Sequence, residues 1–403
     1  AMRVALYEGS WEKYHKGTKF ATEDNHTEFF QEVMKWGDEQ FFKSKLALNT
    51  KDTDKEYVNA EDAFAHLFNK KDLSQIQEAV LWKKYSVADG VFHRLGALLA
   101  SGAVDGQGPS GLSKSLVDNY LNADGTFINP KDEKYKDFNE MFKERDARLL
   151  VTVMHSGPDC KYRASSPTNK PMNVRAYDAT GTEDEMKEKN EDIVSPNLNG
   201  DGNSKSVTGF HIRLGIDTTY VDNESETVVV LFRYAEGLLC YAEAAEELDL
   251  CTDDVLNKTL KPLRERAGVT YVKPTKADPN FPFTGLSPVL QEIRRERRSE
   301  LALQGFRLDD LMRWAVAGTL KGQDGRGRGA YLGEDGVLYK SFSPKGRESL
   351  KLVLKDNDGW TDPLQQYLPQ GYLFDLNRDY LLPIPPDELQ LNRELKQNPG
   401  WGD

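Results

Sequence analysis

The chain has 403 residues, of which 38% are hydrophobic and 29% are charged, and this is enough apolar material for a sizeable core in one large domain or a few smaller ones. Its formal net charge of −12 argues against a nucleic-acid partner, because binding to a phosphate backbone needs a cationic surface. The sequence contains no apolar run of about 18 residues, the length that would span a bilayer.

The first predicted helix covers residues 3–16, where large apolar side chains recur at helical spacing. These side chains are Val4, Leu6, Tyr7 and Trp11. No N-cap residue precedes them, so the chain opens as if in the middle of a helix. Uncovered groups of this kind would form an apolar patch that marks a missing partner surface. We therefore expect these side chains to be exposed or to be covered by a segment outside this chain.

The rest of the N-terminal part, residues 1–95, is also predicted to be mainly helical. Apolar residues recur at helical spacing over 27–44, and a short helix is expected over 60–69. The compact apolar run 79–86 is compatible with an extended segment. Paired helices joined by short turns are typical of helix–turn–helix repeats, although no fixed repeat length is evident here.

Residues 96–226 differ in composition, because Gly, Asn, Pro, Asp and Ser, which break regular secondary structure, recur there at short intervals. This part is expected to be rich in loops, and the alternation over 208–216 predicts one strand. Gly106, Gly108 and Gly111 fit the spacing of a dinucleotide-binding loop, but no strong strand and no βαβ unit surround them. A plain loop is therefore the preferred interpretation.

A second loop, Asn197-x-Asn199-x-Asp201-Gly202, is similar to a calcium-binding loop. It lacks an acidic first ligand, and its twelfth position is Thr208 in place of Glu. We prefer a plain Asn/Gly turn, with a bound calcium ion as the less favoured alternative. The six histidines are scattered without the spacing of a zinc site, so no other metal and no cofactor is predicted.

Helical spacing returns over residues 227–316. The predicted helices cover 228–248, 254–266 and 288–304. Gly268 is expected to close the second of them, and Gly305 to mark a break after the third. The remaining segment, 317–403, is polar and Gly-rich and is predicted to be irregular.

The segment 292–300 is dense in Glu and Arg, which would suit either acid–base catalysis or a structural ion-pair network. Arg297 falls on the apolar stripe of its predicted helix. A charge in that position must be paired, and Glu300 or Glu243 is the expected partner. We favour the structural network, because such networks also contain perturbed titratable groups and no catalytic constellation is found elsewhere.

Five segments resemble signature blocks of the starch-utilisation D-type (SusD/RagB-like) family. Residues 233–248 resemble its R-x-A-E-x-L-L-x-Y-A-E-A-x-x-E-L helix, and residues 263–268 resemble its R-x-R-A-G block. Residues 293–314 are similar to its E-R-R-x-E-L…G-x-R-x-x-D-L-x-R-W block, and residues 383–400 to its P-I-P…Q-N-P-G ending. Residues 5–11 resemble a helix from the middle of the same proteins. The blocks follow the order of the family.

The resemblance implies a mostly α, tetratricopeptide-like helical-repeat fold (SusD-like) with a large loop-rich insertion that contains short strands. Residues 1–403 are then expected to form a single domain, in which repeat parts 1–95 and 227–316 accompany a ligand-facing part, 96–226, and an irregular part, 317–403. The family's signal peptide, lipobox cysteine and early repeats are not found in the printed sequence, so we expect them to lie outside it.

The resemblance also implies a function. Members of this family are non-catalytic proteins of the bacterial outer membrane, held at the cell surface by an N-terminal lipid, which here would lie outside this chain. They capture an oligosaccharide or polysaccharide and deliver it to a TonB-dependent transporter. The same role is expected for this chain, and no enzymatic activity is expected.

Sugar-binding sites combine flat aromatic rings, which cover the apolar faces of sugars, with polar groups that bond to their hydroxyls. The candidate ligand-binding residues are Trp82, Tyr85, His93, His155, Asp159, Tyr162, Arg163, Asn169 and Tyr177. Packing or simple exposure explains any one of them at least as well. Tyr162 and Arg163 are the preferred pair, because they lie between Pro, Gly and Ser residues where a side chain can project.

Two alternative functions stay open at this point. A binding protein of the same family could capture peptides, in a groove that offers partners to a peptide backbone rather than stacked aromatic rings. A helical-repeat scaffold could instead bind another protein and no small ligand. Retention on polysaccharides, on peptides or on neither would separate the three.

Overall fold

The structure is a computed structural model that describes residues 1–21, 23–52, 55–56, 59–94, 111–155, 206–215, 224–322, 325–342, 344–351 and 353–402. Its helices are α1 (Met2–Tyr14), α2 (His26–Trp36), α3 (Ala60–Asn69), α5 (Lys114–Val117), α6 (Ala147–Thr152), α7 (Tyr234–Glu247), α8 (Asp253–Lys258), α9 (Leu260–Arg266), α10 (Pro288–Glu300), α11 (Arg307–Arg313), α12 (Val337–Ser341), α13 (Pro344–Leu350) and α14 (Pro386–Leu391). Two antiparallel strand pairs join β1 (Lys51–Asp52) to β2 (Lys55–Glu56) and β3 (Ala79–Lys83) to β4 (Val229–Arg233). Single helical turns of the 3-10 type cover Glu133–Lys136, Glu140–Phe142 and Ala317–Leu320.

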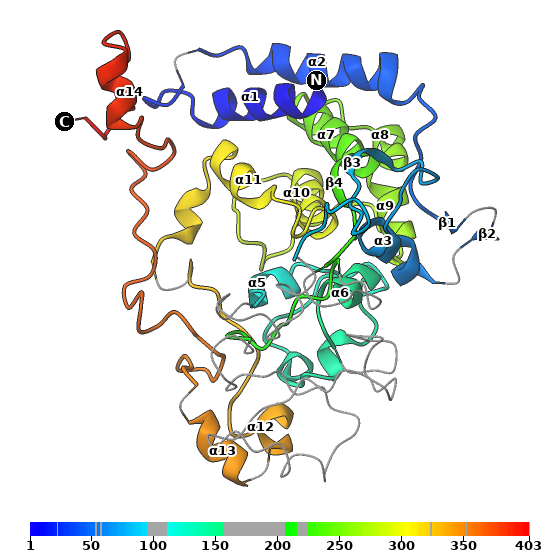
Figure 1. The fold of residues 1–403 in the computed structure, drawn as a ribbon, viewed down its shortest axis with the longest axis vertical. Helices are drawn as coiled ribbons and strands as arrows, with labels where there is room; N and C mark the ends of the chain where they lie inside the picture. The colour runs from blue at the N-terminus through cyan, green and yellow to red at the C-terminus, as the bar shows by residue number, and fades with distance from the viewer. Residues whose placement is uncertain are drawn as a thin grey trace.

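The helices gather toward one end of the molecule. Figure 1 shows α1 and α2 side by side at that end, next to α7 and α8, whereas α12 and α13 lie at the opposite end. The described part is therefore mostly α, as the sequence predicts, with a helical half and an irregular half. None of the helices in the described ranges is long and apolar enough to cross a bilayer.

α7 is the central helix of the helical half and packs against α1, α2, α8, α9 and α10. Small residues allow the close approach of a π-helical turn, Gly37–Phe41, that follows α2. A Cβ atom at Gly237 would lie 2.3 Å from the ring of Phe41, and one at Gly37 would lie 2.3 Å from the ring of Tyr241. The contact between this turn and α7 therefore requires glycine on both sides.

An apolar cluster lies in the irregular half and joins segments that are far apart in the sequence. Its buried aromatic members are Tyr120, Tyr135, Phe138, Phe142, Phe210 and Phe342. Backbone hydrogen bonds reinforce it, because Leu112 N donates to Phe210 O at 2.8 Å and Lys114 N donates to Arg328 O at 2.7 Å. The cluster therefore fixes α5 and the segment around residue 328, which form walls of the cleft described below.

Several predicted boundaries are confirmed. α3 has the predicted limits, and the run that starts at Ala79 is extended, as β3. α9 ends in a Schellman motif, in which Gly268 has φ +70° and its N–H donates to Glu265 O at 3.1 Å. Gly305, with φ +87°, lies in the turn that separates α10 from α11. These signals succeeded because each depends on local backbone chemistry.

The predicted helix over 228–248 is wrong at its beginning, because Val229–Arg233 forms β4. β-branched side chains such as those of Val229 and Val230 favour strands. β4 also pairs with β3, with Leu81 opposite Phe232. This pairing satisfies the backbone groups that a helix would have satisfied internally.

The helix predicted over 254–266 is interrupted at Thr259, where α8 ends and α9 begins. Pro262 explains the break, since its nitrogen cannot donate to the carbonyl of Lys258 and its ring would collide with that carbonyl. The helix predicted over 27–44 gives way to the π-helical turn after Trp36. In the described part of the strand predicted over 208–216, only Ile212 forms a β-bridge, with Val153.

The expectation for the apolar face of α1 is wrong for Leu6, and it is met only in part by Tyr7 and Trp11, which are both half-buried. Leu6 is buried inside the chain by Phe30, Val33 and Cys240. Trp11 is half-buried, and its Nε1 donates to the Phe20 carbonyl at 2.9 Å. α2 and α7 therefore cover much of this face, while Tyr7 is half-buried and Val4 is 72% exposed.

Candidate functional site

The buried face of α10 carries charged side chains that bond to one another. The carboxylate of Glu300 accepts hydrogen bonds from Arg148, Arg233 and Arg266, which come from α6, β4 and α9. Burial alone would raise the pKa of Glu300, but the three guanidinium groups hold it well below its usual range. One carboxylate thus ties three elements to α10. Groups bonded in this way stabilise the fold and are not free to act on a ligand.

Arg297 is paired, as expected, but with a different carboxylate from those predicted. Its Nε donates to both oxygens of Asp310 at 2.8 Å. Glu300 and Glu243 are therefore wrong as partners, and Glu243 is bonded instead to Arg313 at 2.6 and 2.7 Å. The turn after α10 brings Asp310 of α11 to Arg297, and spacing within one helix cannot predict this contact.

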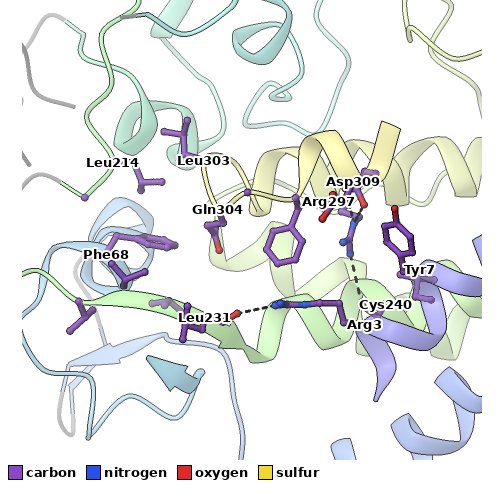
Figure 2. A pocket seen from close by; sticks show the side chains of 18 of the residues that line it. Arg3, Tyr7, Phe68, Leu214, Leu231, Cys240, Arg297, Leu303, Gln304 and Asp309 are labelled. Atoms are coloured by element: carbon purple, nitrogen blue, oxygen red, sulfur yellow. Dashed lines mark hydrogen bonds and ion pairs between the residues drawn. The ribbon is translucent and has the colours of Figure 1, made fainter. Parts of the chain in front are cut away.

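A cavity of about 410 Å³ lies between α1, β4 and the turn from α10 to α11. Figure 2 shows Arg3 and Tyr7 of α1 toward one end of this cavity. Apolar side chains gather toward the other end: Phe68, Leu214 and Leu303. Arg3 is already bonded to Glu236 and, at 2.9 Å, to the carbonyl of Leu231. Arg3, Arg297, Asp310 and Arg313 are bonded within the protein, whereas the hydroxyl of Tyr7, the amide of Gln304 and the carboxylate of Asp309 also line this cavity.

A larger cleft of about 900 Å³ lies between the helical half and the irregular half, and we call it the cationic cleft. Its walls are residues of 113–119, 278–283 and 325–328, the facing side chains of α10 and α11, and the rings of Trp360 and Tyr372. Seven Lys or Arg side chains line it, against three Asp side chains. In a chain with a net charge of −12, this cleft is a local concentration of positive charge.

Most of these cations are paired with carboxylates. The pairs are Lys114 with Asp118, Arg295 with Asp278 at 2.6 Å, Arg326 with Asp362 at 3.0 Å, and Arg328 with Asp356 at 3.0 Å. Lys131 is exposed at the rim of the cleft, and two arginines also differ from the paired cations. Among the residues that the structure describes, no carboxylate lies within ion-pair distance of Arg298 or Arg307. Their charges are therefore available at the surface of the cleft.

The contacts that the described residues make with Arg298 and Arg307 come from neutral groups. Arg298 Nη2 donates to Ser115 Oγ at 2.8 Å, and the Arg307 guanidinium lies 5.4 Å from the ring centroid of Phe283. Burial and the nearby charge of Arg307 lower the pKa of Arg298 to about 9, and burial lowers the pKa of Arg307 to about 10. Both side chains are still charged at neutral pH, so the cleft holds two like charges near each other at an electrostatic cost.

The cleft also has a free hydrogen-bond acceptor. One oxygen of Asp118, Oδ2, accepts from Lys114, whereas Oδ1 is buried and has no hydrogen-bond partner among the described residues. Burial raises the pKa of Asp118, against the opposing effect of Lys114. A buried acceptor of this kind costs free energy unless a water molecule or a ligand hydroxyl donates to it.

The aromatic rings of the cleft differ in exposure. Phe281, Phe283 and Trp360 are each less than 10% exposed and pack mainly within the protein. Lys114 Nζ lies 4.4 Å from the ring centroid of Trp360. Tyr372 is 40% exposed, so it is the aromatic side chain of this wall with the most surface for a ligand.

The predicted ligand-binding residues that the structure describes lie elsewhere. Tyr85 and His93 meet edge to face with ring centroids 4.5 Å apart, and Trp82 is half-buried on β3. His155 lies 3.2 Å from Arg213 in the irregular half. None of these four candidates lines either cavity. The other predicted residues lie outside the described residues: Asp159, Tyr162, Arg163, Asn169 and Tyr177.

The residues of the cationic cleft are not among the ligand-binding residues predicted from the sequence. Tyr372 follows Pro369 and Gly371, a pattern of chain breakers that could have identified it as a projecting side chain. Arg298 is adjacent to Arg297 but is turned about 100° from it around the helix, so one of the two had to face another surface. No comparable local signal identifies Asp118.

No group of three or more His, Cys, Asp or Glu side chains suited to a metal ion is found within the described ranges. Asn197, Asn199 and Asp201 lie outside those ranges. The calcium alternative therefore stays a prediction.

Comparison with known proteins identifies relatives of the chain. The profile of the SusD family matches residues 74–401, whereas no curated protein sequence matches. A solved SusD-like carbohydrate binding protein from Bacteroides fragilis is 20% identical, with 98% of this chain and 63% of that chain covered and a TM-score of 0.59. Another SusD-like protein from the same organism is 18% identical, with coverage of 99% and 63% and a TM-score of 0.57. The fold is thus SusD-like, and the chain spans less than two thirds of the length of these two relatives.

Proposed function

Because the chain belongs to the SusD family, we propose that it is a non-catalytic binding protein that captures glycans. The family match over residues 74–401 carries the proposal. The proposal extends to the setting of the family: attachment to the bacterial outer membrane by a lipid outside this chain, and delivery of the glycan to a TonB-dependent transporter.

The cationic cleft supplies the groups that such a ligand needs. Tyr372 presents a partly exposed ring to the apolar face of a sugar. The Asp118 carboxylate lines the same cleft, and its buried Oδ1 would accept from a hydroxyl after a small shift of the side chain. The volume of about 900 Å³ is in the range of pockets that enclose a small ligand, and it is sufficient for a short oligosaccharide segment. We therefore place the capture site here rather than at Trp82, Tyr85, His93 or His155.

A glycan array with the purified protein, followed by titration calorimetry on the retained saccharides, tests the proposal. Tyr372→Ala should weaken binding about tenfold, because a ring contact contributes up to about 1.5 kcal/mol. The control is Tyr367→Ala, which removes a ring that is 82% exposed and does not line the cleft. The control should leave affinity unchanged.

The outcomes separate the alternatives. Retention of peptides without saccharides would replace the proposal with a peptide-capturing protein. Retention of neither, together with stable capture of a partner protein, would support a scaffold. Saccharide binding that is equally strong in the Tyr372→Ala variant would place the site away from the cationic cleft.

A further inference from the structure

The cations of the cationic cleft divide into those that maintain the fold and those that do not. Arg326 shows the first kind, because it bonds to Asp362 and also donates to the carbonyls of Leu368 and Pro369 at 3.0 and 3.3 Å. Its donors are used to join two segments of the irregular half. Such a residue cannot bind a ligand without loss of these contacts.

Arg298 and Arg307 show the second kind. The carboxylates nearby form their ion pairs with other cations, since Asp118 pairs with Lys114 through Oδ2, and Asp310 pairs with both Arg297 and Arg313. The neutral contacts of the two arginines, a serine hydroxyl and a phenyl ring, do not compensate a positive charge. Arg307 also opens α11, where free backbone N–H groups disfavour a cation.

Among the described residues no carboxylate forms an ion pair with either guanidinium group, and two such groups are costly in a half-buried position, so an anion bound between them would reduce that cost. Guanidinium groups bind planar oxyanions with parallel hydrogen bonds, which gives direction as well as affinity. The sugar-binding features are in the same cleft: the Tyr372 ring and the Asp118 acceptor. The anion and the sugar can therefore be parts of one ligand.

We propose that the cationic cleft selects acidic saccharides, with a carboxylate or sulfate of the sugar bound by Arg298 and Arg307. This rests on the proposed glycan capture and names the class of glycan. The remainder of the chain carries a net negative charge, which repels a long polyanion. Selectivity is therefore local to the cleft and applies to short acidic oligosaccharides.

The test is calorimetry with tri-galacturonate and with its methyl ester, which has the same sugar rings without the charges. The acid should bind about 10- to 100-fold more tightly than the ester, the range expected for charge-assisted hydrogen bonds. High salt should weaken binding of the acid and not of the ester. A sulfated galacto-oligosaccharide compared with its unsulfated form decides between sulfate and carboxylate as the preferred anion.

Variants then assign the effect to residues. Arg298→Gln and Arg307→Gln should each weaken binding of the acid at least tenfold and weaken binding of the ester much less, so that the acid preference falls, while Arg298→Lys should retain part of the preference. Arg393→Gln, an equal change of charge at an exposed position outside the cleft, is the control. Because the two arginines repel each other, neither Gln variant should lower the melting temperature.

The outcomes distinguish this inference from the proposed function. Equal affinity for acid and ester, unchanged in the Gln variants, would overturn the inference and leave glycan capture intact. Gln variants that melt several degrees lower and show no change in the acid preference would assign the two arginines to the fold, which also overturns it. Retention of no saccharide at all on the glycan array would overturn the proposed function itself.

Discussion

Glu300→Gln tests the buried ion-pair network most sharply. Glu300 is fully buried at the end of α10, and its two oxygens accept from Arg148, Arg233 and Arg266. Gln has nearly the same shape but no charge. Its amide NH₂ group would lie against at least one guanidinium group, and no hydrogen bond can form there because both groups are donors. The substitution therefore leaves three buried positive charges with a neutral partner.

The expected loss in free energy of unfolding is about 3–5 kcal/mol, the range for removal of one member of a buried, hydrogen-bonded ion pair. The remaining carboxylates limit the loss. Arg148 also bonds to Asp146 and Glu296, and Arg266 also bonds to Glu78 at 3.1 Å. The lower part of the range is therefore expected.

Urea unfolding followed by circular dichroism measures this loss, because urea does not screen charges and its slope reports whether the folded state has changed. The control is Glu265→Gln, which removes one member of an exposed pair with Lys261 at 3.8 Å. The control should cost about 0.5 kcal/mol or less. A loss below about 1 kcal/mol for Glu300→Gln, with an unchanged slope, would refute the reasoning that this network stabilises the fold.

Two further predictions concern packing and pH. Gly237→Ala should lower the free energy of unfolding by about 1–3 kcal/mol in urea titrations, because its new methyl group would lie 2.3 Å from the ring of Phe41; a neutral result would mean that the π-helical turn shifts freely. Acid should destabilise the protein in two stages, measurable as melting temperature against pH. Burial lowers the pKa of His211 from 6.5 to about 4, so stability is lost as pH falls through that window. Burial also lowers the pKa of His15, so His211→Gln should reduce this stage and not remove it entirely. Burial would raise the pKa of Glu243, but Arg313 and neighbouring arginines hold it at about 2, so a second loss follows between about pH 4.5 and 2. A melting temperature that is constant from pH 6.5 to 4 would contradict the first stage.

The sequence allowed correct prediction of features that depend on neighbours along the chain. α3, the closing Gly268 and the break at Gly305 all follow from capping and left-handed backbone preferences. β4 was predicted as part of a helix. Its partner strand β3 lies about 150 residues earlier in the sequence, and no local pattern indicates that the two segments pair. The helix signal of α7 was strong enough to extend the predicted helix across Val229–Arg233.

The candidate site could not be predicted in the same way. Its residues come from α5, α10, α11 and the C-terminal part. These segments are far apart in the sequence and come together only in the folded chain. An aromatic residue such as Trp82 or Tyr85 resembles a sugar platform in the sequence, but the structure places both outside the two cavities. The sequence predicts that Arg298 belongs to a structural charge network, whereas the positions of its described neighbours show that none of their carboxylates forms an ion pair with it.

The most direct test of saccharide capture in the cationic cleft is a crystal structure with an oligosaccharide retained on the array. We predict electron density for the saccharide between α5 and α11, with a ring against Tyr372 and a hydroxyl within hydrogen-bond distance of Asp118 Oδ1. Density for the saccharide in the cavity beside α1, or around Trp82 and Tyr85, would contradict the account.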